Sequence, residues 1–143
     1  MRVLVINGAN LNMLGHRDPT QYGTQTLADI ADLVHVTCQS AQTEWFTTNH
    51  EGAIIDRLQS VVLNKDADAV IINAGAYTHY SYAIRDALEM LTVPKVEVHL
   101  SNIYKREKFR RKSLLSAVCD DVIVGLGAQG YVLAVQKCLE RAQ

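Results

Sequence analysis

A tyrosine and an arginine share one short stretch of this sequence and could together supply a base. Arg17 and Tyr22 lie between Gly15 and Gly23, in the segment GHRDPTQYG. A tyrosine with the usual pKa of ~10 is a poor base at neutral pH, but a neighbouring cation favours its phenolate form. Arginine suits this purpose because its guanidinium stays charged. The same spacing is also typical of a mobile surface loop whose tyrosine packs at the hinge, and spacing alone favours that second interpretation.

A carboxylate and an imidazole lie inside an apolar run later in the chain. Glu97 and His99 both belong to the run Val96–Leu100. Residues two apart on a strand point to the same side, and a buried polar group without a partner is costly. One such residue alone would favour a structural role. Because Asn10 and Asn73 also follow apolar runs and would meet His99 at one rim of a sheet, the combination favours a polar pocket.

The positive charge of the chain is gathered in one place. The sequence has 14 Lys and Arg against 15 Asp and Glu, a net charge of −1, yet six of these basic residues lie between Lys105 and Lys112. Near-neutrality argues against a globally basic nucleic-acid binder, as do the interrupting Glu107 and the single aromatic Phe109 within KREKFRRK. The basic cluster is therefore a local feature of the chain and does not identify a polyanionic partner.

Short apolar runs supply the strands that would position these side chains. They are rich in β-branched residues and bounded by polar residues or glycine, as is typical of parallel strands buried on both faces. The expected strands are Val3–Ile6, Trp45–Thr48 (the weakest), Val70–Ile72, Val96–Leu100 and Val122–Val124.

Apolar residues at helical spacing fill the gaps between the strands. The first helix is expected after Thr26, a plausible N-cap. The four helical patterns comprise Leu27, Ile30, Ala31, Val34, Cys38 and Ala41; Ile54, Leu58, Val61 and Val62; Ala83, Ala87, Leu88 and Leu91; and Val132, Val135 and Leu139. The segment Ser101–Ser116 has little such periodicity. This alternation predicts one domain over residues 1–143, an α/β fold with three layers, flavodoxin-like, around a five-stranded parallel sheet.

Several familiar site templates do not fit. The segment GLGAQG at Gly125–Gly130 matches a dinucleotide-binding pattern, but 13 residues follow it, too few for the second strand and acidic residue of that motif, so a tight turn is favoured. Asn73 stands where a receiver domain would need an aspartate. We find no P-loop, no metal-ligand spacing among the five histidines and no nucleophile elbow, so a metal is not expected.

Cysteine usage and hydropathy point to the cytoplasm. The three cysteines are an odd number without close spacing, which favours reduced, mostly buried thiols. No apolar run approaches the ~20 residues of a membrane span. The apolar stretch before Asn7 is too short for a signal peptide, so no membrane partner is expected.

Five segments together resemble the type II 3-dehydroquinate dehydratases. In order along the chain they are INGANLNMLGHRDPTQYG, NHEGAIIDRL, INAGAYTHYSYAIRDAL, VEVHLSNIYKREKFRRKS and VGLGAQGY. The resemblance covers essentially the whole chain, and the ordered combination is highly specific. It implies a single catalytic domain that dehydrates 3-dehydroquinate to 3-dehydroshikimate, in the shikimate route to aromatic compounds or in quinate breakdown. It also implies that no metal, cofactor or Schiff-base lysine takes part.

The resemblance assigns a role to each acid–base residue. Tyr22 matches the proton-abstracting tyrosine and Arg17 the arginine that keeps it ionised. His99 matches the general acid that protonates the departing hydroxyl. Asn10 matches the residue that helps a water stabilise the enolate, and Glu97 the carboxylate that supports this network. A base on one side of the substrate and an acid on the other would suit an anti elimination.

The resemblance also implies binding positions and an assembly. The substrate-binding positions are Asn73, His79 and Arg110 with the backbone of Leu100 and Ser101; Arg106 matches a supporting arginine near the lid, and Asp86 a residue that reaches a neighbouring subunit's site. For an anionic substrate of this kind, the basic segment is expected to form one wall of a pocket for a small carboxylate, with Arg110 meeting that group. The implied assembly is a homo-oligomer, a dodecamer built from trimers.

The sequence departs from the family pattern at four positions and leaves one other function open. The departures are Ala9 for a usual Pro, Tyr80 and Tyr82 for Thr and Val, and Lys105 for Ala, and they concern the shape of the pocket rim, inhibitor selectivity or subunit contacts rather than the acid–base set. The alternative function is a non-catalytic flavodoxin-like module that binds a flavin or nucleotide. It is supported by the fold and by the turn at Gly125–Gly130.

Overall fold

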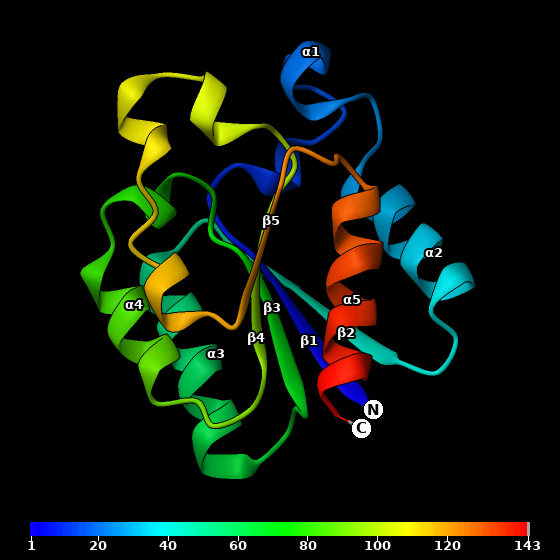
Figure 1. Ribbon diagram of the computed structural model, residues 1–143, viewed down its shortest axis with the longest axis vertical. Helices are drawn as coiled ribbons and strands as arrows, with labels where there is room; N and C mark the ends of the chain where they lie inside the picture. The colour runs from blue at the N-terminus through cyan, green and yellow to red at the C-terminus, as the bar shows by residue number, and fades with distance from the viewer. Residues whose placement is uncertain (143) are drawn as a thin grey trace.

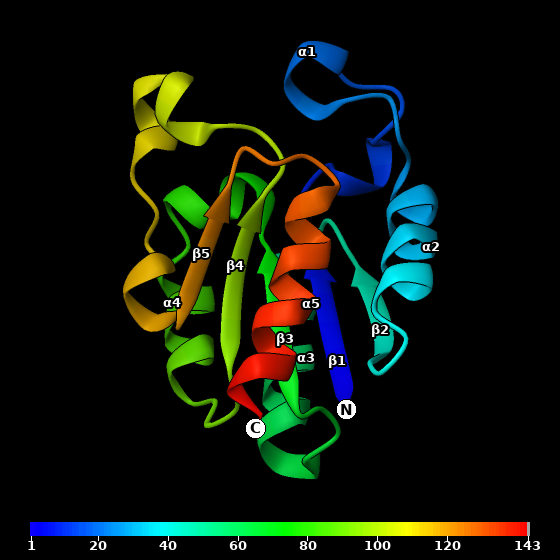
Figure 2. The same ribbon diagram turned by 45° about the vertical axis from the view of Figure 1, so that its right-hand side comes forward.

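The computed structural model describes residues 1–142 and contains one five-stranded sheet in which all strands run parallel (Figures 1 and 2). The strand order is β2-β1-β3-β4-β5, the flavodoxin-like order, so the expected fold class is confirmed. The strands are β1 (Arg2–Asn7), β2 (Gln42–Thr47), β3 (Ala69–Asn73), β4 (Lys95–His99) and β5 (Asp121–Val124).

Helices cover both faces of the sheet. They are α1 (Pro19–Tyr22), α2 (Leu27–Thr37), α3 (Glu51–Asn64), α4 (Tyr82–Glu89) and α5 (Gln129–Arg141). In Figure 2, α2 and α5 lie on one face, while α3 and α4 lie on the other. Strand β1 shows why: Val3 and Val5 belong to the core under α2 and α5, whereas Leu4 and Ile6 belong to the core under α3 and α4. Successive side chains on a strand point to opposite faces, so a continuous apolar run fills both cores.

The first long helix begins where the sequence predicts and ends earlier. Thr26 accepts a hydrogen bond from the backbone of Asp29, whose carboxylate accepts one from the backbone of Thr26, which makes a complete capping box. The expected pattern continued to Ala41, but α2 ends at Thr37 with Cys38 as its C-cap. Cys38 and Ala41 are still buried, because they pack at the turn that leads into β2.

Strand β2 is three residues longer at its start than the predicted Trp45–Thr48, and it stops one residue earlier. Its sequence QTEWFT carries polar residues because β2 is an edge strand that pairs with β1 alone and is partly exposed. An edge strand needs less apolar surface than a central one, so the hydrophobic signal at Gln42 and Thr43 is weak.

The connection from β4 to β5 differs from the others. Where the periodicity was weak, residues 100–120 form three short 3₁₀ helices, Ile103–Lys105, Lys108–Arg111 and Ser116–Val118. This connection carries the basic cluster and rises above the carboxyl ends of the strands, opposite the loop that bears α1 (Figure 1). Strand β4 ends at His99, one residue before the predicted end.

The loops after β1 and β3 touch each other at the floor of this region. A Cβ on Gly8 would lie 2.4 Å from the carbonyl oxygen of Ala74, and one on Gly75 would lie 2.6 Å from that of Ala9. Gly75 also has a positive φ of 61°. Glycine is therefore required at both positions, and its absence of a side chain brings the two strand ends together. Within residues 1–142, no helix has the length and apolar character needed to cross a membrane.

Candidate active site

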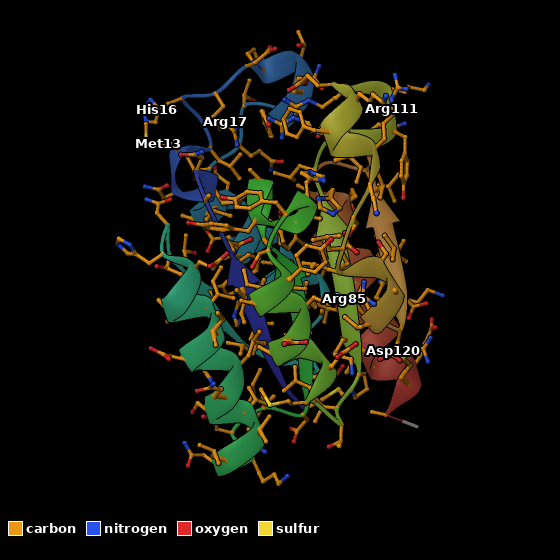
Figure 3. The ribbon with its side chains drawn as sticks, turned by 90° about the vertical axis from the view of Figure 1, so that its left-hand side faces the viewer. Met13, His16, Arg17, Arg85, Arg111 and Asp120 are labelled. Atoms are coloured by element: carbon orange, nitrogen blue, oxygen red, sulfur yellow. The ribbon has the colours of Figure 1, made fainter. Side chains whose placement is uncertain are left out.

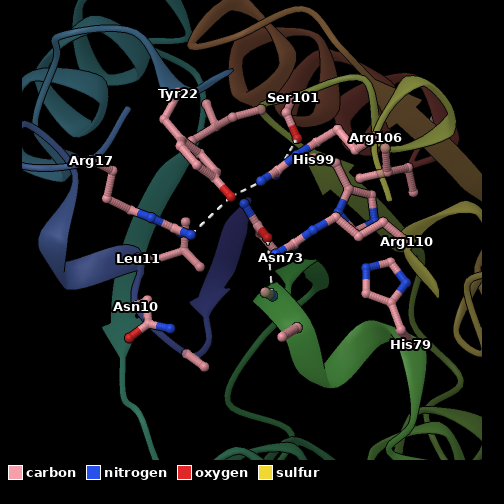
Figure 4. Close-up of a pocket in the computed structure, with 15 residues that line it drawn as sticks. Asn10, Leu11, Arg17, Tyr22, Asn73, His79, His99, Ser101, Arg106 and Arg110 are labelled. Carbon is pink, nitrogen blue, oxygen red and sulfur yellow. Dashed lines mark hydrogen bonds between the residues drawn. The ribbon is translucent and has the colours of Figure 1, made fainter. Parts of the chain in front are cut away.

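A cavity that is partly open to solvent lies at the carboxyl ends of β1, β3 and β4 (Figure 4). Ligands of open α/β sheets bind at this edge, where the strand order reverses. The lining residues are Ala9, Asn10, Leu11, Arg17, Tyr22, Asn73, Gly75, Ala76, His79, His99, Leu100, Ser101, Ile103, Arg106 and Arg110. Ten of the twelve predicted site residues are therefore placed around one space.

One wall is built on the loop that contains α1. Asp18 caps this single helical turn through a hydrogen bond from the backbone of Thr20, and Pro19 occupies its first position. The turn presents the Tyr22 hydroxyl to the cavity, where it accepts hydrogen bonds from Arg17 Nη2 at 2.8 Å and Arg106 Nη1 at 2.6 Å. The Arg17 guanidinium also stacks 3.8 Å from the centre of the tyrosine ring.

Two guanidinium groups therefore donate to one phenolic oxygen at the edge of the cavity. This contact answers the question that spacing alone left open about Tyr22: the side chain points into the cavity rather than merely packing at a hinge (Figure 4). The bond from Arg106 was not foreseen, because the two residues are 84 positions apart and nothing in the sequence pairs them. Arg106 Nη1 also donates to Ser101 Oγ at 3.2 Å, which ties the loop to the end of β4.

The opposite wall is the carboxyl end of β4. Glu97 is fully buried and His99 nearly so, and Nε2 of His99 lies 2.5 Å from Oε2 of Glu97. A carboxylate accepts hydrogen bonds, so Nε2 carries a proton and Nδ1 is the ring nitrogen left for a ligand. The carboxylate also accepts hydrogen bonds from Ser113 Oγ at 2.8 Å and from Ser116 Oγ at 2.6 Å.

These contacts decide the charge of Glu97. Burial by itself would raise the pKa of this carboxyl, but the hydrogen bond from His99, its charge and the two serine hydroxyls outweigh burial and lower the pKa below its usual range. Glu97 is thus an anion held behind His99. Its hydrogen bond to Nε2 fixes the orientation of the His99 ring.

His79 enters the cavity with one fixed tautomer. Its Nδ1 lies 2.8 Å from the backbone carbonyl oxygen of Lys112, and a carbonyl only accepts, so Nδ1 is the donor. Burial lowers the pKa of His79, and nearby positive charge adds to this, although the Lys112 carbonyl opposes it. The neutral ring therefore presents Nε2 to the cavity as an acceptor for a hydroxyl group.

The side that would receive a carboxylate contains a cation and the turn after β4. Arg110 lines the cavity with its side chain 18% exposed and donates to Glu107 at 2.9 Å. Leu100 and Ser101 are buried residues at the start of the connection. Arginine and polar groups after a strand suit an anionic ligand.

The two predicted asparagines lie on the floor. Asn10 has a positive φ of 68°, which asparagine tolerates, and its backbone N–H donates to Asn49 Oδ1 at 2.9 Å. Asn73 ends β3 and is buried; its Oδ1 accepts a hydrogen bond from the backbone of Gly75 at 3.2 Å. Both line the cavity.

Two predicted residues lie outside the described lining. Glu97 lies behind His99 and is hydrogen-bonded to it. Asp86 is exposed on α4 and is not among the lining residues, so a role in this subunit's own cavity does not follow from its position. The sequence analysis did not identify Ser113 and Ser116, because serine is common on protein surfaces and nothing in the sequence places these two beside β4. The one available signal was that a buried Glu97 needs hydrogen-bond donors.

Alternative chemistries find little support among the described residues. The segment Gly125–Gly130 forms a tight turn, with φ of 81° at Gly125 and 57° at Gly127, before α5. In residues 1–142 no group of three or more His, Cys, Asp or Glu is arranged to hold a metal. The three cysteines are free thiols, and burial raises the pKa of Cys119 and of Cys138 to about 12, which makes them poor nucleophiles.

Comparison with known proteins places the chain among enzymes of one kind. The family described as Dehydroquinase class II matches residues 1–139. A 3-dehydroquinate dehydratase of Thermotoga neapolitana is 54% identical over 138 residues, covering 95% of this chain and 92% of that protein. Another, from Chlorobaculum tepidum, is 48% identical over 139 residues, covering 97% of this chain and 94% of that protein.

Solved structures agree with the sequence comparison. The type II dehydroquinase from Butyrivibrio crossotus superimposes with a TM-score of 0.93 at 45% identity, covering 97% of each chain. The type II dehydroquinase from Propionibacterium acnes gives a TM-score of 0.89 at 38% identity, covering 95% of this chain and 94% of that one. The flavin- or nucleotide-binding alternative is not favoured by these relatives.

Proposed function

This chain belongs to the class II dehydroquinase family and is a lyase that dehydrates 3-dehydroquinate, and from this premise we propose which side chains carry the reaction. The family reaction is a step of the shikimate pathway, and quinate breakdown would use the same chemistry. We propose that Tyr22 is the base and His99 the acid of an anti elimination that proceeds through an enolate.

The first step removes a proton next to the ketone. The Tyr22 phenolate takes the α-proton, and the electron pair moves into the carbonyl to give an enolate. Arg17 and Arg106 favour the phenolate because both donate to its oxygen. Asn10 lies on the floor and would help to hold a water against the enolate oxygen, where a preorganised donor contributes most.

The second step expels the β-hydroxyl. The enolate reforms its carbonyl, the new C=C bond forms, and the C–O bond breaks as the hydroxyl takes a proton from Nδ1 of the His99 imidazolium and leaves as water. Glu97 holds Nε2 and stabilises the cation that precedes this transfer. Return of one proton from Tyr22 to His99 resets the site.

The substrate's carboxylate is proposed to bind at the end of β4. Arg110, the backbone of Leu100 and Ser101, and the amide of Asn73 surround that part of the cavity. His79 presents an acceptor to a ring hydroxyl. The observation that carries the assignment is the Tyr22 hydroxyl between two arginines, in the same cavity as the His99–Glu97 pair.

We further propose that residues 1–143 act as one catalytic domain in a dodecamer of trimers, in the cytoplasm. The resemblance to the family supports the assembly, with Asp86 reaching a neighbour's site from its exposed position on α4. The free thiols support a reducing compartment. Light scattering of the purified protein measures the assembly, and a monomer that turns over substrate at full rate would contradict it.

Turnover of 3-dehydroquinate tests the function directly. The product contains a conjugated enone carboxylate, so its formation is followed by ultraviolet absorbance. We expect turnover without added metal or cofactor and without inactivation by borohydride in the presence of substrate, since no Schiff base forms. Purified protein without this activity would refute the assignment.

Removal of either arginine tests the role of Tyr22. Arg17→Met and Arg106→Met should each lower kcat by about 10–100-fold at neutral pH, because the phenolate loses one cationic donor. The deficit should shrink at alkaline pH, where hydroxide supplies the phenolate instead. A deficit that is the same at every pH would show that the arginines do not act through the tyrosine.

A further inference from the structure

A chain of buried polar groups runs beneath the cavity floor and joins three elements. Tyr131, on α5, is fully buried, and its hydroxyl lies between the ends of β1 and β3. It accepts a hydrogen bond from Asn73 Nδ2 at 3.0 Å and donates one to Asn7 Oδ1 at 2.6 Å. Tyr131 is not among the residues described as lining the cavity, so it would act through Asn73.

The direction of each hydrogen bond in this chain follows from one backbone group. The N–H of Gly75 can only donate, so the atom of Asn73 that it meets must be Oδ1. The amide nitrogen of Asn73 must then face Tyr131. The Tyr131 hydroxyl accepts a hydrogen bond from this nitrogen and donates one to Asn7 Oδ1. Gly75 on one side and Tyr131 on the other therefore hold Asn73 in one of its two amide orientations, and we call the chain Asn73–Tyr131–Asn7 the relay.

That orientation decides what Asn73 offers to a ligand. Oδ1 is engaged by the backbone, whereas Nδ2 carries two hydrogens and gives one to Tyr131. The second hydrogen is available at the cavity, so Asn73 presents a donor and selects an acceptor such as a carboxylate oxygen. A flipped amide would place an oxygen against that anion instead.

The relay leaves one buried polar atom without a hydrogen-bond partner. Nδ2 of Asn7 is buried and has no partner among the described residues, and an unpaired buried amide is unfavourable. The ring of Tyr131 also packs against Trp45, with centroids 5.5 Å apart, so a phenylalanine would keep the packing and lose only the hydroxyl. Its hydroxyl is thus separable from its apolar role.

We propose that Tyr131 is a positioning residue that fixes the amide of Asn73 as a donor to the substrate. This inference rests on the proposed binding role of Asn73. Tyr131 belongs to α5 and its hydroxyl is hydrogen-bonded to Asn73 and Asn7, not to the proposed base or acid, so its effect belongs to binding rather than to proton transfer.

The test is a set of substitutions measured with 3-dehydroquinate. Tyr131→Phe should raise KM by about fivefold, because Asn73 loses the acceptor that fixes its amide, and should leave kcat within about twofold. Val135→Ala removes buried volume from the same helix without touching the relay, so it should lower the melting temperature and leave KM unchanged. Asn7→Leu removes the acceptor at the far end and should raise KM in the same direction.

A double variant separates this inference from the proposed function. In an Asn73→Ala background, Tyr131→Phe should raise KM no further, since its target is gone. A raised KM in Asn73→Ala with an unchanged KM in Tyr131→Phe would refute the relay alone. An unchanged KM in Asn73→Ala would refute the binding role of Asn73 and the relay with it, and additive effects would show that Tyr131 acts by another route.

Discussion

Each wall of the cavity holds one of the two proposed proton-transfer residues, but the two walls are supported by different kinds of structure. The Tyr22 wall is an exposed loop with one helical turn, and the hydroxyl is held by two arginine side chains. The His99 wall is the end of a buried strand, where the carboxylate of Glu97 satisfies His99 and two serines. The base side can therefore be altered without disturbing the fold, whereas the acid side is part of the core. This difference predicts which substitutions separate activity from stability.

Tyr22→Phe should have the largest effect on turnover and almost none on stability. Loss of the proposed base should lower kcat by about 10³-fold, within the range that general-base catalysis contributes. The ring is half-buried and keeps its packing, so the melting temperature should stay within about 2 °C of the wild type. Steady-state assays and thermal unfolding measure the two quantities.

A matched control is available for that variant. Tyr82→Phe removes the same hydroxyl from a residue that is 68% exposed on α4, and it should leave kcat unchanged. If Tyr22→Phe also unfolds the protein, the loop is more integrated into the fold than its exposure indicates, and the contrast between the walls fails.

Glu97→Gln should lower both activity and stability. The amide removes the negative charge behind His99 and cannot accept from all three donors, so kcat should fall by about 10²-fold and unfolding should become easier by about 1–3 kcal/mol. Activity lost at unchanged stability would contradict the view that this wall belongs to the core.

The pH dependence of stability gives an independent check on Glu97. Its pKa is lower in the folded state than in the unfolded chain, so the unfolded state takes up the proton first as the pH falls. The stabilisation is therefore present above the ordinary pKa of 4.5 and is lost below it, and Glu97→Gln should remove that part of the slope in acid unfolding. The pKa of His79 is also lowered in the folded state, so stability should fall as the pH drops below 6.5 for this residue too. This contribution should persist in Glu97→Gln.

The sequence predicted the buried wall better than the exposed one. Glu97 and His99 are polar residues two positions apart in an apolar strand, so a shared side and a need for buried partners could be expected from the sequence. The placement of Tyr22 could not, because its bond to Arg106 depends on a connection of short 3₁₀ helices that has little periodicity. Likewise, strand β2 was misplaced at both ends because an edge strand carries a weak apolar signal.

Arg110→Ala should weaken substrate binding, whereas Arg111→Ala should not. Arg110 lines the cavity, so its loss should raise KM by about tenfold, the cost of one charge-assisted contact. Arg111 lies exposed at the outer side of the same segment (Figure 3), and Arg111→Ala should leave KM within about twofold. Equal effects would show that the basic segment acts through its general charge, and a salt titration of KM for both variants would reveal this.

The two serines behind Glu97 should give the smallest effects and the finest test of the comparison. Ser113→Ala and Ser116→Ala each remove one donor from the buried carboxylate, so kcat should fall by about three- to tenfold. Ser113 Oγ also accepts hydrogen bonds from the backbone of Leu115 and Ser116, so its loss should cost more stability than the loss of Ser116.

Ser60→Ala is the matched control. It removes a similar bond from a hydroxyl to a carboxylate, 2.6 Å from Ser60 to Asp66, and Ser60 lies on α3, which does not line the cavity. If Ser60→Ala lowers stability as the others do but leaves kcat intact, the serines act on His99 through Glu97; if all three variants lower kcat alike, general loosening of the fold explains the effect.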